Sequence, residues 1–151
     1  MSMFSQTTEY AVRAMIELAR DPKRAQVLAA DLAERLGIPH HYLAKILQLL
    51  VRARLLNSTR GRLGGFAMAR EAKEITLYEV IAPFEDLAKL DECILGEATC
   101  TDDRACPLHN YWKSARERYL QELEQRNLSE LAEFQSVLLA KKRAEPGPNK
   151  K

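Results

Sequence analysis

The chain has 151 residues, of which 46% are hydrophobic and 29% charged, enough for one domain with a real core and an appendage. No apolar run approaches the ~18 residues of a membrane span, and the first residues lack the pattern of a secretory signal. We therefore expect a cytoplasmic protein with no membrane partner. The net charge is only +2, but residues 1–70 hold eleven basic and five acidic residues, whereas residues 71–140 hold seven and fifteen. The basic half indicates a polyanionic partner.

Three helices are predicted in the first third of the chain. Apolar residues recur at helical spacing in residues 6–20, 28–36 and 40–53. Asp21-Pro22 ends the first of these helices, and Gly37 supplies the left-handed backbone position between the second and the third. Two short helices joined by a glycine-containing turn, after a supporting helix, are typical of a helix-turn-helix.

A two-stranded wing is predicted directly after the third helix. Residues 55–59 and 66–69 have the composition of strands, and residues 60–65 contain the glycines of a turn between them. The fold class expected from these elements is therefore mainly α, with a winged helix-turn-helix domain.

The second half of the chain is predicted to be helical around one irregular segment. Thr76 and Glu79 form a capping box that opens a helix extending to about Leu90. Irregular residues follow, and a long helix is then expected over 108–126, with the apolar stripe Leu108, Trp112, Ala115, Tyr119 and Leu123. Asn127 caps a last helix near 128–141, with Glu130 at its third position.

The residues expected to contact DNA lie on the third helix and on the wing. A recognition helix enters the major groove with its N-terminal residues against the base edges, and a wing tip can reach a minor groove or the phosphates. No acidic residue occurs between Arg35 and Arg70. Each candidate alone is equally well explained as an exposed polar side chain, so the prediction depends on their combination. The expected contacts are His40, His41, Tyr42, Lys45, Gln48, Arg52, Arg60 and Arg62.

The three cysteines of the chain all lie within 14 positions, in the pattern Cys93-x6-Cys100-x5-Cys106-x2-His109. Their odd number and the lack of an export signal argue against structural disulfides. Soft thiolates on one irregular loop favour an iron–sulfur cluster or zinc, and the wide spacing favours the cluster because zinc sites usually contain tight C-x2–4-C pairs. Merely buried or free thiols are the third interpretation. His109 or Glu9, the latter from a partner subunit, is a candidate fourth ligand, although Glu9 is also explained as a surface acid near a helix N-terminus.

These residues resemble the Rrf family of bacterial regulators, over a range from about Thr8 to Glu133. The resemblance rests on the segments EYAVRAMIELA, LAADLAERLGIPHHYLAKILQLLVRARLL, RGRLGGFAMAR and ITLYEVI, and on the cysteine segment that leads into a long helix.

The resemblance implies a homodimer, with the long helix crossing its partner, and a cluster on Cys93, Cys100 and Cys106. The iron–sulfur regulator type of this family uses a histidine three residues after the last cysteine, which His109 matches. The nitric-oxide-sensing type uses an acidic residue on the first helix, for which Glu9 is the matching position. Both types have five residues between the first two cysteines, where this chain has six. The cluster type, two-iron or four-iron, therefore stays open.

The prediction is a dimeric, sequence-specific regulator, acting as a repressor, whose affinity for double-stranded operator DNA depends on an iron–sulfur cluster. The signal would be nitric oxide, redox state or cluster supply. The alternative is a zinc-bound or metal-free thiol-based redox regulator of the same fold. An enzyme is not expected, because the chain has no C-x-x-C pair and no glycine-rich phosphate loop. The expected parts are a DNA-binding domain (1–90), a cluster loop (91–107), dimerisation helices (108–141) and a disordered basic tail (142–151).

Overall fold

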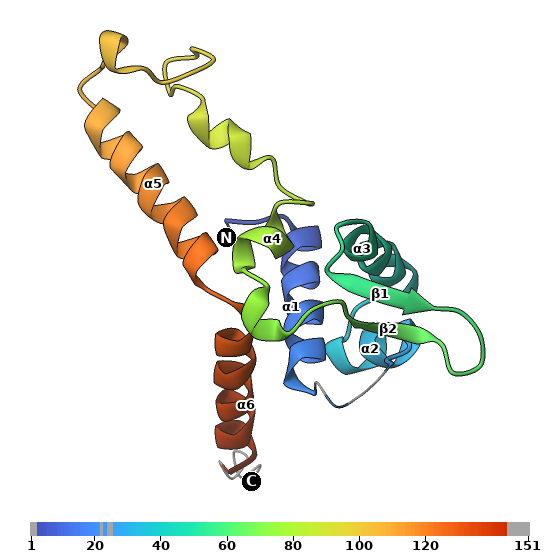
Figure 1. Ribbon diagram of the computed structural model, residues 1–151. Helices are drawn as coiled ribbons and strands as arrows, with labels where there is room; N and C mark the ends of the chain where they lie inside the picture. Colours follow the sequence, from blue (N-terminus) through green and yellow to red (C-terminus); the bar gives the residue numbers. More distant parts are fainter. Residues whose placement is uncertain (1–2, 22, 24–25, 145–151) are drawn as a thin grey trace, which may run out of the picture.

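The computed structural model describes residues 3–21, 23 and 26–144 (Figure 1). This part of the chain is mainly helical and contains one two-stranded sheet, as the sequence predicts. The elements, with η marking a 3-10 helix, are α1 (Gln6–Arg20), α2 (Ala29–Leu36), α3 (His40–Arg52), β1 (Leu56–Thr59), β2 (Gly65–Met68), η1 (Ala72–Glu74), α4 (Leu77–Ile81), η2 (Leu87–Asp91), η3 (Asp102–Arg104), α5 (His109–Gln125) and α6 (Leu128–Ala144).

The first three helices enclose the largest part of the hydrophobic core, and they form the predicted helix-turn-helix. Met15 of α1, Leu32 of α2 and Leu47 of α3 are fully buried in one cluster. Gly37 has a φ of 65° and ends α2, because its N–H donates back to the carbonyl oxygens of Ala33 and Glu34. Glycine adopts this left-handed conformation without steric cost, so α3 can start in a new direction.

The two strands form the predicted wing, and a third segment holds it to the core. β1 and β2 are antiparallel, and their pairing ends with Thr59 opposite Gly65. On the other edge of β2, the N–H of Phe66 donates to the oxygen of Val27 at 2.8 Å, and the N–H of Val27 donates to the oxygen of Phe66 at 2.9 Å. A Cβ on Gly65 would lie 2.6 Å from the Val27 oxygen, so this close approach requires glycine. The wing is thus fixed to the helix-turn-helix at its base.

Two predicted boundaries in the second half are wrong. The helix that starts after Thr76 ends at Ile81 and does not reach Leu90. Pro83 explains this difference, because it has no N–H to continue the helical hydrogen bonds; only the short 3-10 helix η2 follows. The last helix, in contrast, continues past residue 141 to Ala144. Its final residues include Lys141, Lys142 and Arg143, which are good helix formers and are favoured at a helix C-terminus.

The predicted disordered tail, 142–151, is therefore helical in its first three residues. Residues 145–151 of this prediction lie outside the described residues.

The stripe predicted on the long helix is only partly buried in the chain. Leu123 is 6% exposed, whereas Leu108 is 39% exposed and Trp112 and Tyr119 are of intermediate exposure. Most of α5 extends away from the core, beside the segment that follows α4 (Figure 1). The apolar residues near its start therefore have little of this chain to pack against.

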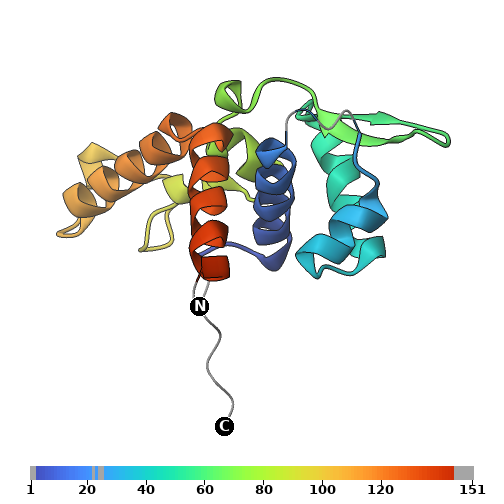
Figure 2. The ribbon, with the colours of Figure 1, turned by 90° about the horizontal axis from the view of Figure 1, so that it is seen from below.

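The joint between α5 and α6 is fixed to the segment that follows the wing. The N–H of Leu77 donates to the oxygen of Arg126 at 2.8 Å, and the N–H of Leu128 donates to the oxygen of Ile75 at 3.0 Å. The predicted cap of α6 is confirmed, because the Asn127 side chain accepts from the N–H of Glu130 at 3.1 Å. α6 then packs along α1, and Figure 2 shows α1 between α6 and the α2–α3 pair.

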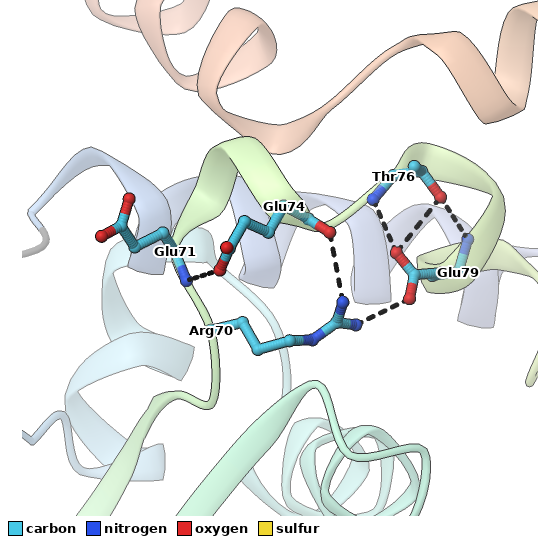
Figure 3. A network of polar contacts seen from close by, with 5 residues as sticks. All are labelled: Arg70, Glu71, Glu74, Thr76 and Glu79. Atoms are coloured by element: carbon cyan, nitrogen blue, oxygen red, sulfur yellow. Dashed lines mark hydrogen bonds and ion pairs between the residues drawn. The ribbon is translucent and has the colours of Figure 1, made fainter.

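A network of polar contacts joins the end of the wing to α4 (Figure 3). Arg70, two residues after β2, donates to the Glu79 carboxylate at 2.6 Å and to the backbone oxygen of Glu74 at 3.2 Å. The same carboxylate accepts from the N–H of Thr76 at 2.9 Å, and the Thr76 hydroxyl accepts from the N–H of Glu79 at 3.2 Å. The predicted capping box is confirmed, and Arg70 connects it to the wing.

Replacement of Thr76 by alanine is expected to destabilise the protein by about 1 kcal/mol, because the N-terminus of α4 loses its cap. For a chain of this size the melting temperature should fall by about 2–4 °C per kcal/mol. Chemical and thermal denaturation measure both quantities. Thr99→Ala, at an exposed threonine outside any helix, is the matched control. Equal stability of the two variants would contradict a role of the cap.

Candidate functional site

The exposed face of α3 carries most of the side chains that were predicted to contact DNA. His40 and His41 lie at the N-terminal end of the helix, and Lys45, Gln48 and Arg52 follow on later turns. All five side chains are exposed. Such a face can approach base edges and phosphates, because its donors are not used by the core.

Tyr42 differs from the other predicted residues of α3. It is partly buried, its ring packs edge-on against Tyr10 with the centroids 5.7 Å apart, and its hydroxyl is hydrogen-bonded to Thr7. Both partners belong to α1. Tyr42 therefore fixes the start of α3 against the supporting helix.

Side chains of α3 and the wing line one common hollow. His40 and Gln48 contribute from the helix, and Arg60 and Gly61 contribute from the wing. The predicted residues of the two elements thus face the same space.

The tip of the wing is a tight turn that depends on glycine. The N–H of Gly64 donates to the oxygen of Gly61 at 3.0 Å, so Arg62 and Leu63 occupy the two corners of the turn. A Cβ on Gly64 would lie 2.3 Å from the backbone oxygen of Thr59. Arg62 is exposed, and Leu63, which was not among the predicted contacts, is 88% exposed.

The three cysteines lie at the far end of the arm that the chain forms after α4. The chain extends outward to this segment and returns as α5 (Figure 1). Arg116 of α5 holds the two sides together through an ion pair with Asp91 at 3.1 Å. Backbone hydrogen bonds order the segment: the N–H of Cys100 donates to Asp91 at 3.1 Å, and the N–H of His109 donates to Cys106 at 2.9 Å.

The side chain of Cys100 lies at the centre of a polar cluster. Its Sγ is 3.1 Å from Nδ1 of His109, and Cys93 and Cys106 lie near enough to influence its ionisation. His109 is 2% exposed, and its Nε2 is 2.8 Å from Oδ1 of Asp102. Sequence spacing did not point to Asp102. The 3-10 turn η3, which the sequence pattern does not reveal, precedes α5 and carries this carboxylate.

The local environment shifts two ionisable groups of this cluster. Burial raises the pKa of the Cys100 thiol, and the neighbouring Cys93 and Cys106 add to the rise, whereas Arg116 opposes it. The hydrogen bond from His109, and then that from Lys113, hold the pKa of Asp102 below its usual value. At neutral pH Asp102 is therefore a carboxylate that accepts hydrogen bonds and donates none.

Glu9, the other predicted fourth ligand, is not brought to the cysteines within the chain. It lies in the first turn of α1 and forms an ion pair with Arg13 at 3.9 Å, with about half of its side chain exposed. Figure 1 shows α1 in the body of the molecule and the cysteine segment at the end of the arm.

The residue types of this segment, three thiols and one imidazole, are ones that an iron–sulfur cluster or a zinc ion can use. Within residues 3–21, 23 and 26–144, no group of three or more His, Cys, Asp or Glu side chains is compact enough to hold one ion. A cluster distributes its ligands over two or more irons, so its ligands need not meet at one point. Three soft sulfur donors and one imidazole are ligands that iron–sulfur centres use.

Comparison with known proteins identifies the family. The family model "Rrf2: Iron-dependent Transcriptional regulator" matches residues 4–133. The chain belongs to the Rrf2 family. The resemblance seen in the sequence is confirmed, and the protein is a DNA-binding transcription regulator. Relatives in the Rrf2 family are regulators and not enzymes.

Individual relatives support the same assignment. The regulator NsrR of Shouchella clausii is 34% identical over 82% of this chain and 84% of its own length. The regulator IscR of Vibrio atlanticus is 33% identical over 85% of this chain and 74% of its own length. The solved structure of CymR, described as the global cysteine regulator of B. subtilis, has a TM-score of 0.76 at 24% identity, covering 89% of this chain and 98% of that one. This last likeness shows that the predicted winged fold is correct. None of the described helices is both long and apolar enough to cross a membrane.

Proposed function

We propose that this Rrf2-family protein is a cytoplasmic, homodimeric repressor whose affinity for its DNA operator is controlled by an iron–sulfur cluster. Cys93, Cys100 and Cys106 would hold the cluster, with His109 as the fourth ligand. The observation that carries this proposal is the position of Cys100, whose Sγ lies 3.1 Å from a nitrogen of the buried His109 ring, on the same loop as Cys93 and Cys106. When bound, the cluster supplies a centre that nitric oxide, oxidants or a shortage of iron can modify.

His109 is preferred over Glu9 as the fourth ligand because it already lies beside a thiol. Its ring is buried and held in one orientation, whereas Glu9 is half exposed and paired with Arg13. Glu9 would reach the cluster only from the partner subunit. The two ligands are distinguishable, because His109→Ala should alter the spectrum of the cluster if histidine binds and Glu9→Ala should alter it if glutamate binds.

The DNA contacts would come from α3 and the wing. His40, His41, Lys45 and Gln48 would face the major groove, Arg52 the phosphates, and Arg60 and Arg62 the adjacent minor groove or backbone. Tyr42 would act mainly by fixing the start of α3, since its hydroxyl is bonded to α1. The exposure of these side chains and the hollow shared by helix and wing support the proposal.

The homodimer would form through α5. An apolar groove along this helix is lined by Trp112, Ala115 and Tyr119, with Phe4 stacked on Tyr119 at 6.4 Å. Tyr111, in the first turn of α5, is 71% exposed. A second copy of α5 would cover these side chains, because exposed aromatic patches usually mark protein–protein interfaces.

A continuous chain of contacts would connect the cluster to the wing. The cluster loop leads into α5, and the residue that ends α5, Arg126, accepts a hydrogen bond from the N–H of Leu77 in α4. Glu79, also in α4, accepts a hydrogen bond from Arg70 at the end of the wing. A change in the cluster that shifts α5 would thus move the wing relative to the dimer axis. Two arrangements with different operator fit would account for regulation.

The test is to purify the protein without oxygen, record its visible spectrum and assay iron and sulfide. DNA ligands are then selected from a random pool, and their affinity is compared for the cluster-bound and cluster-free forms. A brown protein with both elements, whose two forms differ in affinity, supports the proposal. A protein that stays colourless after anaerobic reconstitution overturns the cluster assignment.

One observation favours a second candidate, a zinc-bound or metal-free thiol regulator. Cys93 and Cys106 both lie near enough to Cys100 to raise the pKa of its thiol, so oxidation could join neighbouring thiols in a disulfide without a cluster. This candidate predicts a colourless protein whose DNA affinity changes with oxidation of its thiols.

A further inference from the structure

We propose that Asp102 is a positioning residue, which fixes the tautomer of His109 so that Nδ1 is the nitrogen presented to the cluster. This inference rests on the proposed function, because it concerns the fourth ligand of the same site.

The argument begins with the two nitrogens of one buried ring. Nε2 of His109 is 2.8 Å from the Asp102 carboxylate, and Nδ1 is 3.1 Å from Sγ of Cys100. A neutral imidazole carries a single N–H. A carboxylate can only accept, so the hydrogen belongs on Nε2 and the lone pair on Nδ1 points to the thiols. The ring is 2% exposed, so bulk water does not compete for either nitrogen.

Asp102 is itself held in place from the other side. Lys113, one turn after His109 on α5, donates to both carboxylate oxygens at 3.2 and 3.3 Å. Asp102 belongs to η3, between Cys100 and Cys106, whereas His109 and Lys113 belong to the first turns of α5. The carboxylate thus joins the cysteine loop to the helix that would form the dimer.

A carboxylate bonded to the distal nitrogen makes an imidazole a stronger donor to its metal, and loss of such a partner typically costs about 10–100-fold in metal affinity. A stronger donor favours the oxidised iron. Removal of the charge of Asp102 is therefore expected to raise the reduction potential of the cluster and to speed its loss to a chelator.

The experiment compares Asp102→Asn with Asp103→Asn, which makes the same charge change one residue further along the same 3-10 turn. Reduction potential and the rate of iron release to a chelator are measured on the cluster-bound proteins. Asp102→Asn should release iron about 10–100-fold faster, with a more positive potential, whereas Asp103→Asn should match the wild type. Equal behaviour of the two variants would overturn the inference.

A second measurement uses the cluster-free protein and does not depend on the cluster. Nitrogen NMR of the histidine rings reports which nitrogen carries the hydrogen, and the chain has only three histidines. The buried ring of His109 should carry its hydrogen on Nε2 in the wild type and lose this preference in Asp102→Asn. A hydrogen on Nδ1 in the wild type would contradict the inference. If the protein bound no cluster at all, the proposed function would fail, and this spectrum would still decide the role of Asp102.

Discussion

Replacement of Cys100 by alanine is expected to abolish the visible absorption of the protein and reduce its iron content to background. Cys100 is the proposed ligand whose sulfur lies beside His109, 3.1 Å from its Nδ1, so its loss removes a thiolate from the middle of the proposed site. The fold should survive, since Cys100 lies in the arm and outside the hydrophobic core. Substitutions at such positions usually change stability by no more than about 0.5 kcal/mol. Visible spectra, iron analysis and circular dichroism measure these results.

Thr99→Ala, next to Cys100 and exposed, is the control for the loop backbone and should remain brown. The alanine variant at Cys100 should also bind selected DNA like the cluster-free wild type, because both lack the same centre. A Cys100→Ala protein with full colour and iron would remove this residue from the ligand set.

The helix-turn-helix was predictable because its signals are local. Leu43, Leu47 and Leu50 recur at the spacing of one helix face, and all three are fully buried. Gly37 has the positive φ that its place between two helices requires. Periodicity and backbone chemistry act within a few residues, so the sequence alone determines these elements.

The second half was less predictable because its structure depends on distant partners. The capping box at Thr76 correctly marks where α4 begins, but the apolar pattern beyond Pro83 wrongly extended the helix to Leu90. The residues after Pro83 are held by other elements instead, as when Glu85 accepts hydrogen bonds from the backbone of Ser5 and the hydroxyl of Thr8 on α1. No helical spacing reports contacts across nearly 80 positions.

The cysteine site was predictable in its residue types but not in its full set of contacts. Its donor types and their order were evident from sequence, and His109 was named as a candidate ligand. The contact of His109 with Asp102, in contrast, arises from irregular backbone between residues 100 and 109 that no periodicity describes. Glu9, the other candidate ligand, lies on a different element, α1, and would reach the cysteines only from the partner subunit, so only the assembled dimer can test that prediction.

The double substitution Arg60→Ala and Arg62→Ala is expected to weaken binding to selected DNA by on the order of 100-fold at low salt. A dimer would lose up to four cationic contacts, so the slope of log affinity against log salt should fall by about 3–4. Arg60 and Arg62 lie on either side of Gly61, in a turn whose tight geometry depends on Gly64. Removal of the two arginine side chains should therefore leave the backbone of the wing intact. Titration of labelled DNA over a series of salt concentrations measures both effects.

The double variant Lys141→Ala with Lys142→Ala is the matched control. It removes the same charge from α6, on the opposite side of α1 from α3 (Figure 2), and should change the slope little. If the two double variants reduced the slope equally, the effect would come from net charge, and the wing would not be part of the DNA interface.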